Sequence, residues 1–318
     1  MTAGTGPADG RSGNLARFDG FADLYDAHRA TPPAALGPLL TAYAGASDPQ
    51  VVDLGSGTGL STRWAASWAG SVIGVEPNDD MRLIAEAQPG PSVRYVAAVA
   101  EATGLPDADA DIVLAVQAMH WLEPGATLAE VARILRPAGV FAVVDMDWPP
   151  AIGNATAESA WEYLHRRIRV LEARVARGEA DDELRAPIHD DDPALVGDDL
   201  ADPHRDRAMP GGVRSWSKRE HLARMRSSGH FAYTREVVMS DVVVGGTDRF
   251  IALMRSQGSY QGLLRAGLTD DEIGMTAFVE VVDAAPGGSD GRMVCCWRIR
   301  LGVRPDSLDR DLDADRPQ

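Results

Sequence analysis

Cysteine is nearly absent from this chain, whose 318 residues hold only Cys295 and Cys296, adjacent in the sequence. Neighbouring residues of a strand point to opposite faces, so this pair favours neither a stable disulfide nor a metal site. We expect both cysteines to serve as small core residues. The cysteine content therefore excludes a fold that depends on several disulfides.

Basic residues and long apolar runs are also scarce. Lysine and arginine number 31 against 47 aspartates and glutamates, which gives a formal net charge of -16 and a pI near 4.8. Binding of nucleic acid rests on basic side chains that displace counterions, so we expect no polynucleotide partner. No apolar run is long enough to cross a bilayer, and the N-terminus lacks the order of a secretory signal. We expect a cytoplasmic protein without membrane association.

Apolar residues make up 45% of the chain, enough for the core of one large domain or of a domain with an insertion. Residues 1–14, rich in Gly, Ala, Thr and Ser, are too polar to bury themselves. The same holds for residues 304–318, rich in Asp, Arg and Pro. Both ends are expected to be disordered tails.

A glycine-rich turn between residues 51 and 60 organises the chain. The apolar run Val51-Val52-Asp53-Leu54 turns through Gly55, Gly57 and Gly59 into a helical pattern, which predicts strand, tight loop and helix. Glycine lets the backbone come close to a ligand without a Cβ in the way. A second strand, 72–75, ends at Glu76, where an acid can accept both ribose hydroxyls. The pair predicts a site for a nucleoside-bearing cofactor.

The spacing of the glycines bears on which cofactor binds. The dinucleotide fingerprint requires glycine at the first, third and sixth positions of the loop. Here the glycines stand at 55, 57 and 59, and Leu60 occupies the sixth position. The fit to a nicotinamide dinucleotide is poor.

Further motifs follow in order over about a hundred residues. They are Val99–Pro106 with Glu101, Asp111–Trp121 with His120, and Glu130–Gly139. With Asp-Leu-Gly-Ser-Gly-Thr-Gly and Glu76, they resemble class I S-adenosylmethionine-dependent methyltransferases, in the small-molecule (ubiquinone-biosynthesis-like, methyltransferase type 11/25) branch.

The resemblance implies an α/β fold, doubly wound around a mostly parallel, seven-stranded Rossmann-like sheet with an antiparallel edge strand. It also implies an N-terminal helical lid, which we place at 15–47, ahead of a cofactor-binding core at 48–150. We expect a helical and acidic insertion at 151–230, and the remaining sheet edge with a helical substrate cap at 231–303. Periodicity predicts strands at 92–97, 111–116, 139–145, 231–244 and 292–301, and helices at 124–135, 157–177 and 216–228. In the helix 124–135, Glu130 is expected to face outward.

The implied cofactor is S-adenosyl-L-methionine, with S-adenosyl-L-homocysteine as product. The glycines would give its amino-acid portion access to the backbone, Glu76 would hold the ribose, and residues 100–102 would contact the adenine. The expected cofactor residues are Asp53, Gly55, Ser56, Gly57, Thr58, Gly59, Leu60, Glu76, Pro77, Met81, Ala100, Glu101, Ala102, Gln117, Ala118, His120 and Trp121. For Glu101, a role as a solvated loop acid stays open.

His120 follows the fourth strand, where methyl donor and acceptor are expected to meet. An imidazole there could accept a proton from a hydroxyl or amine as it is methylated. We favour contact with the cofactor or the cavity wall over the role of general base, because the sequence gives no distances.

The lid resembles the Phe-x-x-x-Ala-x-x-Tyr-x-x-x-Arg entry segment of the family, with Phe18, Ala22, Tyr25 and Arg29 in place. Tyr25 and His28 are candidate catalytic residues, although this segment could equally be one packed helix face. The candidate substrate residues are Arg29, Trp148, Arg255, Ser256 and Tyr260. Interior packing or salt bridges are equally open roles for the last three.

Residues 179–206 are densely acidic and include Asp190, Asp191 and Asp192. Such a triplet could hold Mg²⁺ against a diphosphate, since hard cations bind carboxylate oxygens. A solvated loop is the favoured role because charge blocks usually are solvated, so no metal site is assigned.

The sequence thus predicts methyl transfer to O, N or C of a small, secondary-metabolite acceptor. Two other classes stay open: an NAD(P)-dependent oxidoreductase, and a non-catalytic protein that binds the cofactor for regulation. The only expected partner is the small-molecule acceptor. The sequence does not decide between a monomer and a homodimer.

Overall fold

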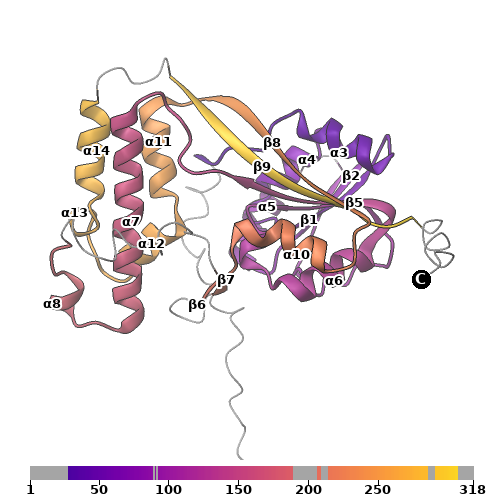
Figure 1. The fold of residues 1–318 in the computed structure, drawn as a ribbon, viewed down its shortest axis with the longest axis horizontal. Coiled ribbons are helices and arrows are strands. Elements are labelled where there is room, and N and C mark those ends of the chain that lie inside the picture. The colour runs from indigo at the N-terminus through magenta and orange to yellow at the C-terminus, as the bar shows by residue number, and fades with distance from the viewer. Residues whose placement is uncertain are drawn as a thin grey trace, which may run out of the picture. The chain divides into compact units, whose positions relative to one another are not determined.

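The computed structural model describes residues 28–88, 90, 92–188, 206–208, 214–285 and 291–306. The chain forms two compact units, and it passes between them more than once. The sheet unit comprises Thr31–Met146, Trp216–Ser240 and Cys296–Gln318. The helical unit comprises Met1–Ala30, Asp147–Ser215 and Asp241–Cys295. Figure 1 labels the elements of both.

A seven-stranded sheet has the order β3-β2-β1-β4-β5-β9-β8. Neighbouring strands from β3 to β5 pair in parallel, whereas β9 runs antiparallel to β5 with Val143 opposite Arg300. The strands are β1 (Gln50–Leu54), β2 (Ser71–Val75), β3 (Val93–Val96), β4 (Ala110–Val116), β5 (Leu135–Met146), β8 (Tyr233–Val244) and β9 (Arg292–Val303). This is the expected doubly wound, mostly parallel sheet with an antiparallel edge.

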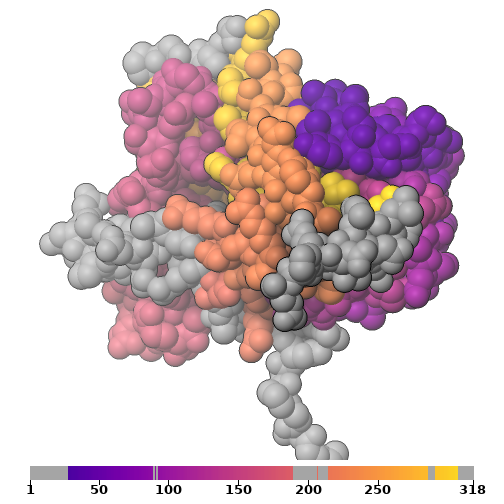
Figure 2. Space-filling model, turned by 45° about the vertical axis from the view of Figure 1, so that its right-hand side comes forward, coloured from indigo at the N-terminus to yellow at the C-terminus, as the bar shows by residue number. Residues whose placement is uncertain are grey.

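Helices cover both faces of this sheet, as buried parallel strands require (Figure 1). On one face lie α3 (Leu36–Ala44), α4 (Leu60–Ala65) and α5 (Asp79–Ala87), and on the other lie α6 (Pro124–Ile134) and α10 (His221–Ser227). Leu128 and Val131 of α6 and Met225 of α10 share one hydrophobic core with Phe141 and Val143 of β5. Figure 2 shows the outer surface of α3 in indigo.

The helical unit has a separate core around α7 (Ala155–Arg177). Trp161 of α7 packs against Phe250 and Phe278, and the cluster extends to Tyr260 and Leu263. The other helices are α8 (Asp181–Leu184), α11 (Gly246–Arg255), α12 (Gly258–Arg265), α13 (Asp270–Ile273) and α14 (Met275–Ala284). A short ladder joins β6 (Arg207–Ala208) to β7 (Arg214–Ser215).

Several elements differ in detail from the pattern of the sequence. The helix expected at 216–228 is a 3-10 turn, η4 (Lys218–Glu220), followed by α10. Strand β5 begins at Leu135, before the Pro137-Ala138-Gly139 turn that seemed to separate it from α6. Glu130 is buried, contrary to expectation, because its carboxylate accepts hydrogen bonds from Thr103 and Arg133. Periodicity predicted a polar face but not this internal partner.

Cys295 is buried and Cys296 half-buried, and neither forms a disulfide with a described residue. In the described part of the chain, no helix combines the length and apolarity needed to cross a bilayer. Tyr25, Asp190–Asp192 and most of both expected tails lie outside the described residues.

Candidate functional site

The strand order creates a switch point between β1 and β4. From β1 the chain moves outward to β2 and β3, and it then returns to place β4 on the other side of β1. Ligands of open α/β sheets bind beyond the carboxyl ends of the strands at such a point. Three expected segments follow those ends: the glycine loop after Leu54, Glu76 after Val75, and residues 117–121 after Val116. All the expected cofactor residues belong to the sheet unit.

The glycine loop adopts the conformation that the sequence predicted. Gly55, Gly57 and Gly59 have φ of 66°, 54° and 81°, in a backbone region that residues other than glycine rarely adopt. Among the described residues, a Cβ placed on Gly57 would meet nothing within 4 Å, so the backbone there is open on its outer side. A Cβ on Gly59 would lie 2.3 Å from the Tyr95 hydroxyl. Gly57 thus leaves room for a ligand, whereas Gly59 serves internal packing.

Asp53 supports the loop from within. It is fully buried, and its Oδ2 accepts hydrogen bonds from the hydroxyls of Ser61 and Thr62, each 2.7 Å away, in the first turn of α4. Its Oδ1 has no hydrogen-bond partner among the described residues. Burial raises the pKa of Asp53 to about 6, although the two hydroxyl donors oppose the rise and the charge of Glu76 adds to it.

Glu76 links the second strand to the loop. Its Oε2 accepts from the Gly57 amide at 2.9 Å and its Oε1 from the Asn78 amide at 2.8 Å. Burial raises the pKa of this carboxyl, while these backbone donors lower it. A carboxylate has about four acceptor positions. The two hydrogen bonds from backbone amides therefore fix the orientation of Glu76 and leave acceptor positions for a ligand's hydroxyl groups.

The expected adenine side lies around α5 and the segment after β3. Asn78 caps α5 by accepting from the Met81 amide at 2.9 Å, and the Met81 side chain is buried. Ala100 is buried and Ala102 exposed. Glu101 accepts a hydrogen bond from the Glu123 amide at 3.1 Å, so its carboxylate holds the N-terminus of α6. Such a bond occupies one of its acceptor positions.

The segment after β4 is held close to the glycine loop. Gln117 has φ of 53°, an uncommon value for a residue with a side chain, and such strain concentrates at functional sites. The next residue, Ala118, comes so near Gly55 that a Cβ on Gly55 would lie 2.9 Å from the Ala118 methyl. His120 and Trp121 follow in the 3-10 turn η1 (Met119–Trp121), with ring centroids 4.7 Å apart.

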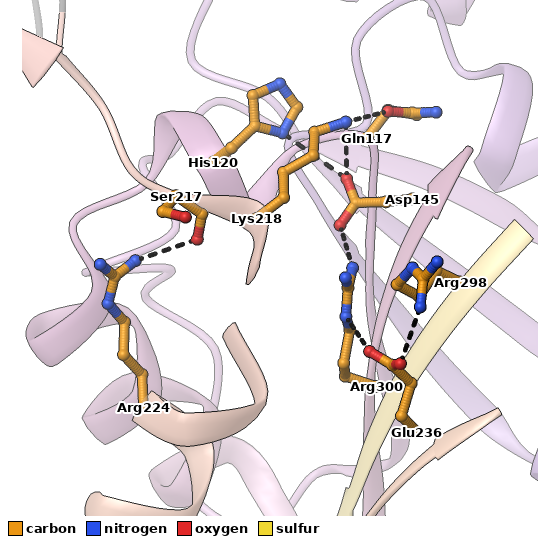
Figure 3. A network of polar contacts seen from close by, with 9 residues as sticks. All are labelled: Gln117, His120, Asp145, Ser217, Lys218, Arg224, Glu236, Arg298 and Arg300. Atoms are coloured by element: carbon orange, nitrogen blue, oxygen red, sulfur yellow. Dashed lines mark hydrogen bonds and ion pairs between the residues drawn. The ribbon is translucent and has the colours of Figure 1, made fainter. Parts of the chain in front are cut away.

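A buried polar network lies under this segment (Figure 3). At its centre is Asp145 near the end of β5, 2% exposed, with Lys218 Nζ at 3.0 Å and Arg300 Nη1 at 2.9 Å. The His120 Nδ1 lies 3.7 Å from the same carboxylate. Glu236 of β8 bridges Arg298 and Arg300, each at 2.9 Å. The network connects the loop after β4 with β5, β9 and β8.

Asp145 is ionised despite its burial. Burial by itself would raise its pKa, but Lys218, His221 and Arg300 outweigh this and hold the pKa below its ordinary value. Burial lowers the pKa of His221 to about 4, so at neutral pH this histidine is uncharged and Lys218 and Arg300 stabilise the carboxylate. Both ring nitrogens of His221 lack a hydrogen-bond partner among the residues that the structure describes.

Two of the expected substrate residues come together within the helical unit. The Arg29 guanidinium lies 4.9 Å above the Trp148 ring and donates to the Ser256 carbonyl at 3.2 Å. Trp148 in turn stacks on Trp161, with centroids 5.8 Å apart and planes 5° from parallel. The segment carrying Arg29 is anchored by Arg249, which donates to the carbonyls of His28 and Arg29. A flat stack of a cation and two indoles results.

The other expected substrate residues have internal partners. The Ser256 hydroxyl is buried and donates to the Leu253 carbonyl at 2.8 Å. Tyr260 is buried with its hydroxyl on Asp270, and Arg255 lies 4.0 Å from that same carboxylate. For these three the contacts are those of interior packing and ion pairing, the alternative that the sequence had left open.

Sequence reasoning missed Lys218, Asp145 and Arg300. Asp145 ends the strand predicted at 139–145 and Lys218 lies in the helix predicted at 216–228, and the sequence gives neither residue a role. One signal was available: a charged residue within an otherwise apolar strand, as Asp145 in Val143-Val144-Asp145-Met146, requires a partner when it is buried. The sequence does not identify that partner.

Comparison with known proteins places this geometry in a family. Residues 52–143 match the family model of a methyltransferase domain. An uncharacterized methyltransferase of Mycobacterium tuberculosis is 37% identical over 113 residues, which are 36% of this chain and 44% of that protein. Another from a Synechocystis species is 28% identical over 130 residues, covering 36% of this chain and 60% of the relative. The chain thus spans about half the length of these curated relatives.

A solved structure of a proposed type II methyltransferase from Anaeromyxobacter dehalogenans agrees in fold. Its TM-score is 0.51 at 22% identity, and the alignment covers 87% of this chain and 99% of that one. The family match spans the glycine loop, Glu76 and residues 117–121, the same segments that meet at the switch point. The matched domain and the shared fold support the class I S-adenosylmethionine-dependent methyltransferase superfamily for residues 52–143.

Proposed function

We propose that this protein transfers a methyl group from S-adenosylmethionine to an O, N or C atom of a small acceptor. The observation that carries the proposal is the hydrogen bond between the Glu76 carboxylate and the backbone amide of Gly57. A buried carboxylate at the end of β2 is fixed by the Gly57 and Asn78 amides, next to a loop in which no atom of the residues that the structure describes fills the space of a Gly57 Cβ. This arrangement fits a ribose beside a small charged group.

The residues fit the cofactor by their chemistry. Glu76 would accept hydrogen bonds from the ribose, and the glycine loop would give the amino-acid portion access to backbone amides. Met81, Ala100 and Ala102 would border the adenine, and Gln117, His120 and Trp121 would line the side of the reacting methyl group. When bound, S-adenosylmethionine supplies an already activated methyl group on sulfur.

The chain itself mainly has to align donor and acceptor and exclude water. Such positioning can contribute about 7–11 kcal/mol toward the barrier in favourable cases. His120 lies beside Asp145 and would either shape the cavity or accept a proton from the acceptor. Arg29 and Trp148, which contact each other within the helical unit, stay candidate residues for binding the acceptor.

Isothermal titration with S-adenosylhomocysteine tests the proposal directly. The wild type is expected to bind it, and Glu76→Ala is expected to weaken binding about a hundredfold, because charge-assisted hydrogen bonds contribute about 1.5–3 kcal/mol each. Glu86→Ala, which removes an exposed acid from α5, is the matched control and should bind like the wild type.

The same titration with a nicotinamide dinucleotide separates the oxidoreductase alternative. Binding of that cofactor in place of S-adenosylhomocysteine would contradict the proposal, as would normal binding by Glu76→Ala. Incubation with labelled S-adenosylmethionine and a panel of small phenols, acids and amines then tests turnover and identifies the acceptor. Tight cofactor binding without labelled product would favour the regulatory alternative.

A further inference from the structure

Lys218 is the single lysine among the 31 lysine and arginine residues of the chain, and it is buried. Its side chain is 9% exposed. Because lysine is almost never buried without partners, we expect its ammonium to be paired. The ammonium donates to Gln117 Oε1 at 2.9 Å and lies 3.0 Å from Asp145 Oδ1. One nitrogen therefore joins the segment after β4 to the end of β5.

A lysine suits this place better than an arginine. Both contacts are made by one compact ammonium, whereas a planar guanidinium would spread its donors over several atoms. The backbone nearby is fixed as well, because the Trp216 amide donates to the His120 carbonyl at 2.9 Å. Residues 216–218 thus form a strap that holds η1 and the Gln117 side chain at the switch point.

The contact determines which end of the Gln117 amide is presented. An ammonium has donors only, so the atom of Gln117 that faces it is the oxygen. The amide nitrogen with its two N–H donors then points away from Lys218 (Figure 3). Gln117 directly precedes Ala118, which packs against Gly55 of the glycine loop. The donors thus belong to the segment that contacts the loop expected to receive the cofactor's amino-acid portion.

The charges of the network favour an anionic partner for these donors. It contains the acids Asp145 and Glu236 and the bases Lys218, Arg298 and Arg300, while His221 is neutral above about pH 4. Its buried members, Asp145, Lys218 and Arg300, carry one excess positive charge, which is screened little. Contact with the Lys218 ammonium also polarises the Gln117 amide, which strengthens its N–H groups as donors.

We propose that Lys218 is a positioning residue that orients Gln117 so that its amide donates to the carboxylate of the cofactor's amino-acid portion. The assignment rests on the proposed function, since it requires that cofactor. It adds a role for the only lysine of the chain and a specific group on the ligand that Gln117 recognises.

Two ligands and one near-isosteric variant test this assignment. S-adenosylhomocysteine carries the carboxylate, whereas 5′-methylthioadenosine has the nucleoside and sulfur without the amino-acid portion. Gln117→Glu keeps an oxygen for Lys218 but removes the N–H donors. We expect this variant to bind S-adenosylhomocysteine about tenfold or more weakly, to bind 5′-methylthioadenosine like the wild type, and to lose no thermal stability.

Lys218→Met should weaken S-adenosylhomocysteine binding in the same selective way, because the Gln117 amide is then free to rotate. Arg219→Met, an exposed neighbour on η4, is the matched control and should leave both affinities unchanged. Labelling with ¹⁵N-lysine gives one side-chain signal in NMR, since there is one lysine. That signal should shift with S-adenosylhomocysteine and stay nearly constant with 5′-methylthioadenosine.

The outcomes distinguish a failure of this inference from a failure of the proposed function. A wild type that binds neither ligand would refute the proposed cofactor. A wild type that binds S-adenosylhomocysteine, with folded Gln117→Glu and Lys218→Met variants binding equally well, would overturn the inference alone. Equal weakening of both ligands would also overturn it, because that result points to a structural role of the network.

Discussion

Asp53 and Glu76 are two buried carboxylates close to each other, and at the scale of single residues they do different work. Glu76 is fixed by two backbone amides at the outer side of the loop, whereas Asp53 binds two hydroxyls of α4 within it. Burial raises the pKa of both. Ionised Asp53 therefore costs the fold stability, and the fold tolerates this cost to shape the loop.

Replacement of Asp53 by asparagine should change how stability depends on pH. Its pKa is about 6 in the folded state against an ordinary value of 3.8, so the unfolded state releases its proton first as pH rises. The stabilisation by protonated Asp53 is complete below about pH 4 and is lost as pH rises through 6, a difference of about 3 kcal/mol. Asp53→Asn has no such loss.

Urea unfolding at pH 4 and pH 7 measures this effect. The free energy of unfolding of Asp53→Asn relative to the wild type should rise between these two values. Any constant cost of the new amide cancels in the comparison. A relative stability that stays flat, or that falls toward pH 7, would show that Asp53 is not the titrating group.

At the scale of elements, the glycine loop combines two functions in neighbouring positions. Gly57 and Gly59 both have positive φ, but only Gly59 is surrounded, by Tyr95 and Ala85. The sequence placed the loop between strand and helix correctly because glycine spacing and apolar runs are local signals. Which glycine faces a ligand and which faces the interior depends on β3 and α5, which lie elsewhere in the chain.

Alanine at these two positions should therefore have different consequences. Both variants incur a left-handed backbone strain of about 1–2 kcal/mol. Gly57→Ala is expected to lower the affinity for S-adenosylhomocysteine strongly with only a modest fall in Tm, since its Cβ enters open space. Gly59→Ala should lower Tm further, because its Cβ would lie 3.0 Å from that of Ala85. Calorimetry and titration on both proteins check this, and equal Tm values would contradict the assignment.

At the scale of the whole molecule, two hydrophobic cores are seen in the part of the chain that the structure describes. The sheet unit has one between the sheet and α6 and α10, and the helical unit has one around Trp161 and Phe250. All the expected cofactor residues are in the sheet unit, whereas Arg29 and Trp148 are in the helical unit. A separate core allows either unit to lose stability by itself.

Trp161→Ala should destabilise the helical unit selectively. Removing a buried tryptophan costs about 3–5 kcal/mol. Hydrogen exchange is expected to accelerate in α7 and α14, while β1, β2 and β4 stay protected and S-adenosylhomocysteine still binds. Equal loss of protection in all these elements would mean that the two units unfold as one.

The sequence by itself determined the class of fold, the glycine loop, Glu76 and the stretch after β4. These follow from strand periodicity, glycine φ and the order of motifs, all of which act between near neighbours or along one continuous run. The sequence also named Arg29 and Trp148 as candidate substrate residues. The structure shows that they contact each other within the helical unit.

Only the tertiary structure decided how Lys218, Gln117 and Asp145 meet, and that Glu130 turns inward. Lys218 and Gln117 are 101 residues apart. Their contact depends on how η4 and α10 pack against the sheet, so no local pattern encodes it. A charged residue can be buried only where folding brings a partner close to it. The distance between the two partners is a property of the folded chain and not of the local sequence.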